Sequence, residues 1–185
     1  LIFVSGPFVG KTVYEFLTIA NQAIGGVSTG YTFSEINNAA TAINENFNNP
    51  GSHNGYLTCP PINCSIQNYT TYTQGGWGSP GTSTPGQIRN NYFHLVFPSG
   101  LTIGSNYTLK LTSAAAVENF LPQGGTAGAF NMNYVNPYST SAGVLAGQLV
   151  AATLNVAFHS AGYLGSNPYP MGNLYITTGT FAGFT

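Results

Sequence analysis

The chain has 185 residues, of which 43% are aliphatic, aromatic or cysteine and 4% are charged, whereas globular domains usually carry about 25% charged residues. Three cations cannot form the row of Lys and Arg that neutralises nucleic-acid phosphates, and a few scattered Glu residues exclude an acidic calcium cage. A net charge of −1 gives weak repulsion between copies, so the composition favours an assembly over a dilute cytosolic monomer. The length suits a single domain over residues 1–185.

Two capping boxes predict the first two helices. In a capping box, a Thr side chain accepts a hydrogen bond from the backbone amide of a Glu three residues later, and the Glu side chain accepts one from the Thr amide. The two predicted pairs are Thr12 with Glu15 and Thr32 with Glu35. Apolar residues at helical spacing follow both boxes until Gly25-Gly26 and Asn48-Asn49-Pro50-Gly51.

The remaining short elements are taken from runs of strand-forming or helix-forming residues between turns. Strands are expected at residues 1–5, 56–58, 69–73, 91–97, 107–111 and 174–178, and a short helix at 113–121. Residues 48–90 and 122–140 are otherwise turn and loop material, rich in Gly, Asn and Pro.

Residues 141–159 form the longest helix candidate, and it is apolar on more than one face. A transmembrane helix is one interpretation, but Gln148 and Asn155 interrupt the run, which is shorter than the ~20 residues that a bilayer needs. A central helix buried on several sides fits better, with Gly143 and Gly147 allowing close packing. We therefore expect an α+β fold, in which a small antiparallel or mixed sheet packs with a long buried helix and three shorter helices.

The two cysteines, Cys59 and Cys64, flank a short segment with two prolines, which suits a small disulfide-closed loop. Two free buried thiols are the alternative. A disulfide would place the chain in an oxidising compartment. Three sequons agree with that location and make Asn63, Asn68 and Asn106 candidate glycosylation sites.

The segment from Gly6 to Thr12 resembles a phosphate-binding loop, but it has one residue too few between its glycines. A turn leading into a capped helix explains the same residues. No Asp is available for a Ser-His-Asp triad, and the three His residues, His53, His94 and His159, do not have metal-ligand spacing. We expect no catalytic residue, metal or cofactor, and hence no enzyme.

Trp77 is the only tryptophan and lies among glycines in the segment Thr73–Gly78. It is a candidate platform for stacking on a sugar. The alternative is that the indole packs over a loop and that the glycines give it room.

The two ends of the chain are related in sequence. Residues 174–185 match residues 1–12 at five of twelve positions, namely Leu, Gly, Phe, Gly and Thr. Coincidence in a chain rich in Gly, Thr and Phe is the alternative. A true repeat at this long period indicates an array or an assembly of units.

Several segments together resemble a domain of large secreted surface proteins of gliding-type bacteria that are exported by type IX secretion. The segments are Phe16–Gly26, Ala42–Phe47, Thr73–Gly78, Ala146–Phe158 and Gly172–Ile176. In the order typical of that family, the Gly-Asn-Leu-Tyr-Ile element runs directly into the Phe-Leu-x-Ile-Ala-Asn helix, whereas here the two lie at opposite ends. The resemblance implies a surface location and a structural or adhesive role, and it carries over no catalytic residue.

These observations predict an extracellular or cell-surface structural subunit or repeat that assembles head to tail into a fibre. Its partners would be copies of itself, without nucleic acid and without a transmembrane segment. A carbohydrate-binding adhesin module that uses Trp77 is the alternative. The candidate assembly contacts are the apolar residues of the two related ends: Leu1, Phe3, Phe8, Leu174, Ile176 and Phe181.

Overall fold

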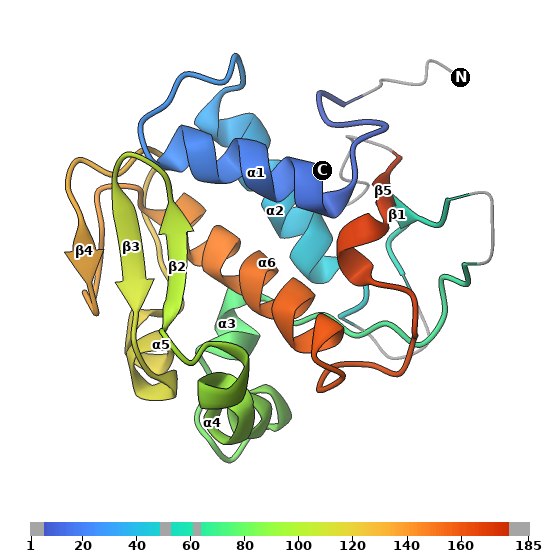
Figure 1. Cartoon of the computed structure of the whole chain (residues 1–185). Coiled ribbons are helices and arrows are strands. Elements are labelled where there is room, and N and C mark those ends of the chain that lie inside the picture. The colour runs from blue at the N-terminus through green and yellow to red at the C-terminus, as the bar shows by residue number, and fades with distance from the viewer. Residues whose placement is uncertain (1–5, 49–52, 61–63, 178–185) are drawn as a thin grey trace.

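The computed structural model describes residues 6–48, 53–60 and 64–177. Its helices are α1 (Val13–Ile24), α2 (Phe33–Glu45), α3 (Gln74–Trp77), α4 (Thr84–Val96), α5 (Ala114–Phe120), α6 (Val144–Ser160) and the 3-10 turn η1 (Met171–Asn173). Its strands are β1 (Leu57–Thr58), β2 (Leu101–Gly104), β3 (Thr108–Leu111), β4 (Tyr134–Val135) and β5 (Tyr175–Ile176). The fold is α+β, as predicted (Figure 1).

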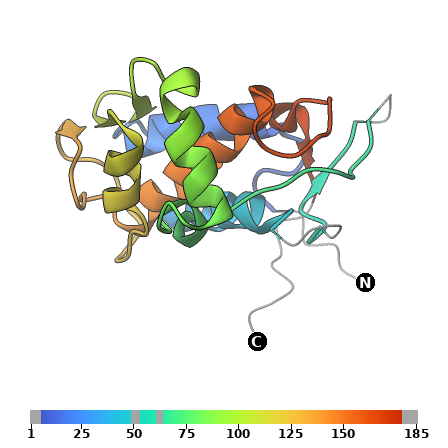
Figure 2. The same ribbon diagram turned by 90° about the horizontal axis from the view of Figure 1, so that it is seen from below.

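Helix α6 lies at the centre of the fold and is buried along most of its length. Helices α1, α2 and α3 all pack against it, and in the view from below α4 lies nearest to the viewer, across α6 (Figure 2). The small residue Gly147 permits one of these contacts, because a Cβ there would lie 2.0 Å from the Gln74 side-chain oxygen. The prediction of a helix buried on several sides is confirmed. Among the described residues, no helix is both long and apolar enough to cross a bilayer.

Both predicted capping boxes are present. The Thr12 hydroxyl accepts from the Glu15 amide, and the Glu15 carboxylate accepts from the Thr12 amide at 2.7 Å. Thr32 and Glu35 repeat this arrangement at the start of α2. The amide bonds lower the pKa of both Glu side chains below the ordinary value of 4.5.

Two small sheets lie at opposite ends of α6 (Figures 1 and 2). At one end, β2 and β3 form an antiparallel hairpin and β4 adds to β3 in parallel, with Leu109 opposite Tyr134. At the other end, β1 and β5 pair antiparallel, with Leu57 opposite Ile176. In place of the single small sheet that was predicted, the described residues thus form one mixed and one antiparallel sheet.

The strand predicted at residues 91–97 is wrong, because residues 91–96 belong to α4 and Phe97 caps its C-terminal end. The Ser83 side chain accepts from the Gly86 amide and so caps this helix, and Pro85 occupies its first turn. Phe93 is a good strand former, but here it faces the core from the helix. Helices α3 and α4 were not expected, so the described residues contain five α-helices in addition to α6, where three were predicted.

The segment 69–73, also expected as a strand, pairs with no other strand. Its backbone is bound instead to residues of other elements: the Thr71 amide donates to the Phe47 carbonyl, and the Tyr72 amide donates to the Asn155 side chain. The predicted disulfide between Cys59 and Cys64 is present, with a Cα–Cα distance of 5.5 Å.

Candidate functional site

The segment that contains β5 is bonded through its backbone on both sides. On one side, the Ile176 amide donates to the Lys11 carbonyl at 2.9 Å, and the Val13 amide donates to the Leu174 carbonyl at 3.0 Å. On the other side it pairs with β1, and the Thr177 amide donates to the Tyr56 carbonyl at 3.0 Å. The C-terminal segment therefore lies between two stretches from elsewhere in the chain.

Leu174 and Ile176 anchor this segment, because both side chains are fully buried. Phe8, from the related N-terminal element, is buried too and contacts Phe16 edge to face with ring centroids 5.0 Å apart. These three candidate assembly contacts thus fill the core of their own chain. The other three, Leu1, Phe3 and Phe181, lie outside the described residues.

The loop that resembles a phosphate-binding motif has its polar groups engaged within the chain. The Gly10 amide donates to the Ile176 carbonyl, and the Lys11 amide donates to the Phe8 carbonyl. The Thr12 hydroxyl caps α1. The loop therefore serves as the entry turn of a capped helix and as a partner of the C-terminal segment.

The expectation that Trp77 offers an exposed platform for a sugar is wrong, because the side chain is 0% exposed. The indole stacks on Phe158 at 5.2 Å and donates from Nε1 to the Asn155 oxygen at 3.0 Å. The neighbouring Gly78 lets the loop approach the core, since a Cβ there would lie 2.4 Å from the Leu121 carbonyl. The alternative packing role is the correct one.

A buried hydrogen-bond network connects three of the segments that carry the resemblance. Asn155 also donates to Asn44 at 3.0 Å, and Asn44 donates in turn to the side chain of Gln148 at 2.8 Å. The Asn46 side chain accepts from two amides, those of Tyr56 and Leu57. The unusual polar residues of these segments therefore hold the core together.

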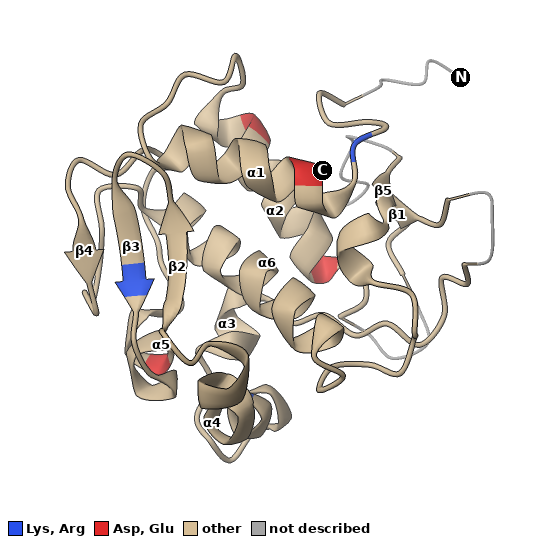
Figure 3. Ribbon diagram, in the orientation of Figure 1, with Lys and Arg blue, Asp and Glu red and all other residues tan. Residues whose placement is uncertain are grey.

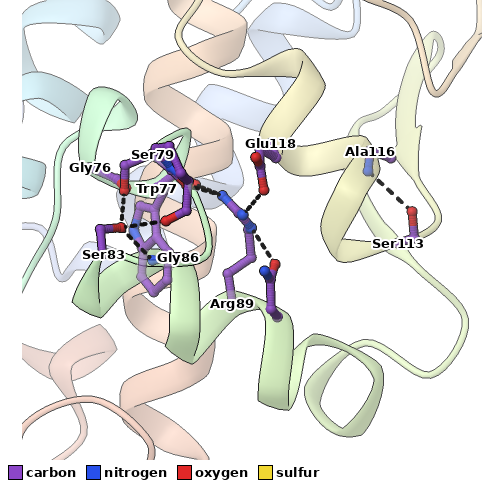
Figure 4. Close-up of polar contacts among 11 residues, drawn as sticks. Gly76, Trp77, Ser79, Ser83, Gly86, Arg89, Ser113, Ala116 and Glu118 are labelled. Atoms are coloured by element: carbon purple, nitrogen blue, oxygen red, sulfur yellow. Dashed lines mark hydrogen bonds and ion pairs between the residues drawn. The ribbon is translucent and has the colours of Figure 1, made fainter.

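Arg89 is the one cation that is fully buried among the described residues. Its guanidinium donates to the carbonyls of Trp77 and Ser79 and forms an ion pair with Glu118, which joins α3, α4 and α5 (Figure 4). Burial lowers the pKa of Arg89, and the charge of Glu118 opposes that shift. Figure 3 shows the other charged residues distributed over the described part of the chain, without a cluster of Lys and Arg or of Glu.

His159 lies at the end of α6 and is almost fully buried. Its ring stacks on Tyr69 at 4.9 Å, and its Nδ1 accepts from the Met171 amide at 3.4 Å. Burial lowers the pKa of His159, partly offset by the Asn167 backbone. In the neutral ring, the bond from the Met171 amide makes Nδ1 the acceptor and leaves the proton on Nε2, which is buried.

A surface hollow of about 640 Å³ adjoins this histidine. It lies between α1, the end of α6 and the loop that leads to β5, and Tyr14, Ser160 and Asn173 contribute to its wall. The sequence analysis missed these residues as a group, because they come from three separate segments. Asn173 belongs to the Gly-Asn-Leu-Tyr-Ile segment, Gly172–Ile176, and this segment is the only local sequence signal that points to it.

Among the described residues, no three His, Cys, Asp or Glu side chains lie close enough together to hold a metal ion. Of the three sequons, Asn68 and Asn106 are exposed, and Asn63 lies outside the described part of the chain. No family model matches this chain, and no curated protein and no solved structure is significantly similar to it.

Proposed function

We propose that this protein is an extracellular structural subunit or repeat of a surface fibre, and that units join head to tail through their terminal elements. The observation that carries the proposal is the position of residues 174–177 between residues 10–13 and β1, held by backbone hydrogen bonds on both sides. The resemblance to surface proteins exported by type IX secretion and the Cys59–Cys64 disulfide support an extracellular location.

Backbone bonding makes this slot suitable for exchange between copies. A β5 segment from a second copy would form the same hydrogen bonds and bury the same two side chains, Leu174 and Ile176, as the chain's own segment does. Exchange of an identical element is a low-cost route to association, and an exchange that does not close on itself produces a filament.

The related sequences of the two ends also suit a covalent array. In that version, residues 174–185 of one unit stand where residues 1–12 of the next unit begin. The two versions differ in the size of the polypeptide on the cell surface. Denaturing electrophoresis of surface material should give a band near 19.4 kDa for exchanged subunits and a much larger band for an array.

The exchange is tested with a pair of engineered cysteines, Thr12→Cys and Tyr175→Cys. These positions pair as an antiparallel bridge, with hydrogen bonds from Ile176 to Lys11 and from Val13 to Leu174 on either side. Such a pair has its side chains close together and can form a disulfide. The native cysteines are already bonded to each other and do not interfere.

If subunits exchange their C-terminal segments, the new disulfide joins different chains. Non-reducing denaturing electrophoresis of the assembled protein should then show a ladder of multimers, which collapses to a single band on reduction. Each single-cysteine variant serves as a control and should give no ladder. Assemblies that contain only the disulfide within one chain would show that β5 stays in its own subunit, and the exchange would be rejected.

A further inference from the structure

The hollow beside His159 is built from neutral polar and aromatic groups. Its wall includes Tyr14, His159, Ser160, Asn167 and Asn173. No Lys, Arg, Asp or Glu lines it. A charged ligand would find no partner of opposite charge there, whereas hydroxyl and amide groups suit a ligand with many hydroxyls.

Tyr14 forms a fixed aromatic wall of this hollow. Its side chain is 44% exposed, yet its ring packs against Gly172, where a Cβ would lie 2.2 Å from a ring carbon. Its hydroxyl is 3.3 Å from the Ser160 hydroxyl, which holds the other end of the ring. A rigid, partly exposed ring is a suitable surface for the apolar face of a sugar.

A second hollow of about 540 Å³ adjoins the first, and the two share Tyr14 and Ser160. It lies between α1, α4 and α6 and is lined mainly by apolar side chains, among them Leu95 and Val156. The Tyr14 ring therefore lies between a hollow that contains several polar side chains and one that is lined mainly by apolar side chains. This arrangement suits a ligand that is extended and carries both hydroxyl groups and apolar faces.

One unengaged polar side chain provides the hydrogen bonds. The side-chain amide of Asn173 has no partner in the part of the chain that the structure describes, whereas that of Asn167 is fully engaged with Ser65, Gln67 and Tyr169. An amide that offers both a donor and an acceptor matches a pair of adjacent sugar hydroxyls.

We propose that the two hollows joined at Tyr14 bind a neutral oligosaccharide, with the Tyr14 ring stacked on a sugar and the Asn173 amide bonded to its hydroxyl groups. This site adjoins the terminal slot, because Asn173 directly precedes Leu174, but the Tyr14 ring and the Asn173 side-chain amide take no part in the backbone hydrogen bonds of the slot. It differs from the buried Trp77 in that its aromatic ring is accessible.

Isothermal titration of the full chain tests this proposal with four hexasaccharide probes: cellohexaose, xylohexaose and mannohexaose as neutral ligands, and hexagalacturonate as an acidic one. At least one neutral probe should bind in the millimolar range or more tightly, and the acidic probe should bind more weakly than it. Tyr14→Ala should weaken that binding about tenfold, the size of one aromatic stacking contact, and Asn173→Ala about fivefold.

Two further variants separate binding from folding. Tyr14→Phe keeps the ring and should retain most of the affinity, and Tyr138→Ala, which removes a tyrosine that is 77% exposed and outside both hollows, should retain all of it. Thermal unfolding of every variant confirms that it is folded. Absence of binding by all neutral probes, a preference for the acidic probe, or unchanged affinity in folded Tyr14→Ala would each overturn the proposal.

Discussion

Asn155 of α6 donates a hydrogen bond to the side-chain oxygen of Asn44 in α2, at 3.0 Å, inside the core. Asn155 is also bonded to the indole of Trp77 and to both backbone groups of Tyr72. One side chain thereby links two helices to the loop that precedes α3. An apolar core alone would not fix the position of this loop, because apolar contacts have no direction.

Replacement of Asn155 by Leu should destabilise the protein by about 3 kcal/mol or more, because it leaves several buried donors and acceptors without partners. The measurement is urea unfolding followed by the fluorescence of Trp77. Thr153→Ala is the matched control in the same helix, since its hydroxyl bonds only to the Leu149 carbonyl. Equal stability of the two variants would show that the network contributes little.

The Arg89 side chain is expected to stabilise the fold through the several N–H donors of its planar guanidinium group as well as through its charge. Arg89→Met should cost about 2–4 kcal/mol, since it leaves the carbonyls of Trp77 and Ser79 unpaired. Arg89→Lys should be nearly as harmful, because an ammonium cannot reproduce the planar fork. Glu118→Gln keeps an acceptor on a partly exposed partner and should cost about 1 kcal/mol at most.

These three variants are compared by chemical denaturation, with Glu45→Gln as a charge-removing control outside this cluster. An Arg89→Lys variant as stable as the wild type would mean that charge alone is sufficient.

Protonation of His159 should destabilise the fold as the pH falls below 6.5. Burial lowers the pKa of this histidine below its ordinary value of 6.5, so the unfolded chain binds the proton more readily than the folded one. The contribution of the neutral His159 to the free energy of unfolding is therefore complete above pH 6.5 and is lost progressively below it. Glu15 and Glu35, whose pKa values are lowered below 4.5, lose their contribution only at more acidic pH.

The free energy of unfolding, measured at a series of pH values, checks this prediction. His159→Phe keeps the stack on Tyr69 and should show a flatter dependence just below pH 6.5. The exposed His94, replaced by Phe, is the control for the removal of a histidine from the surface. The assignment to His159 would fail if both variants kept the slope of the wild type.

Truncation of the chain after Asn173 should destabilise the subunit, because it removes the middle strand of the terminal slot. The loss of buried Leu174 and Ile176 alone amounts to roughly 3–6 kcal/mol. A synthetic peptide of residues 174–185, added to the truncated protein, should raise its melting temperature. A peptide of scrambled sequence is the control, and a truncated chain with an unchanged melting temperature would contradict the prediction.

The sequence predicted the elements that local signals specify. Capping boxes located the starts of α1 and α2, and a mainly apolar run located α6. Helix α4 was missed in part because Gly86 lies in its first turn and its exposed face carries Leu95, so its apolar periodicity is weak.

Features that depend on distant residues could not be predicted. The burial of Trp77 is determined by Asn155 and Phe158, which lie in another helix. The hollow at Tyr14 likewise depends on the packing of α1 against η1 and α6. The repeat of the two ends indicated a relationship between them, but not that Thr12 and Tyr175 pair within one chain.

The pairing of residues 10–13 with residues 174–177 has a mechanical consequence. The two stretches run antiparallel, and the Gly10–Ile176 bond lies at the end from which both chain termini depart. A force that pulls the two termini apart loads this bond and the Thr177–Tyr56 bond first, so the hydrogen bonds break in sequence instead of sharing the load. A unit pulled through both ends is therefore expected to open stepwise from this edge and to lengthen at low force, beginning with the bonds of Gly10 and Thr177.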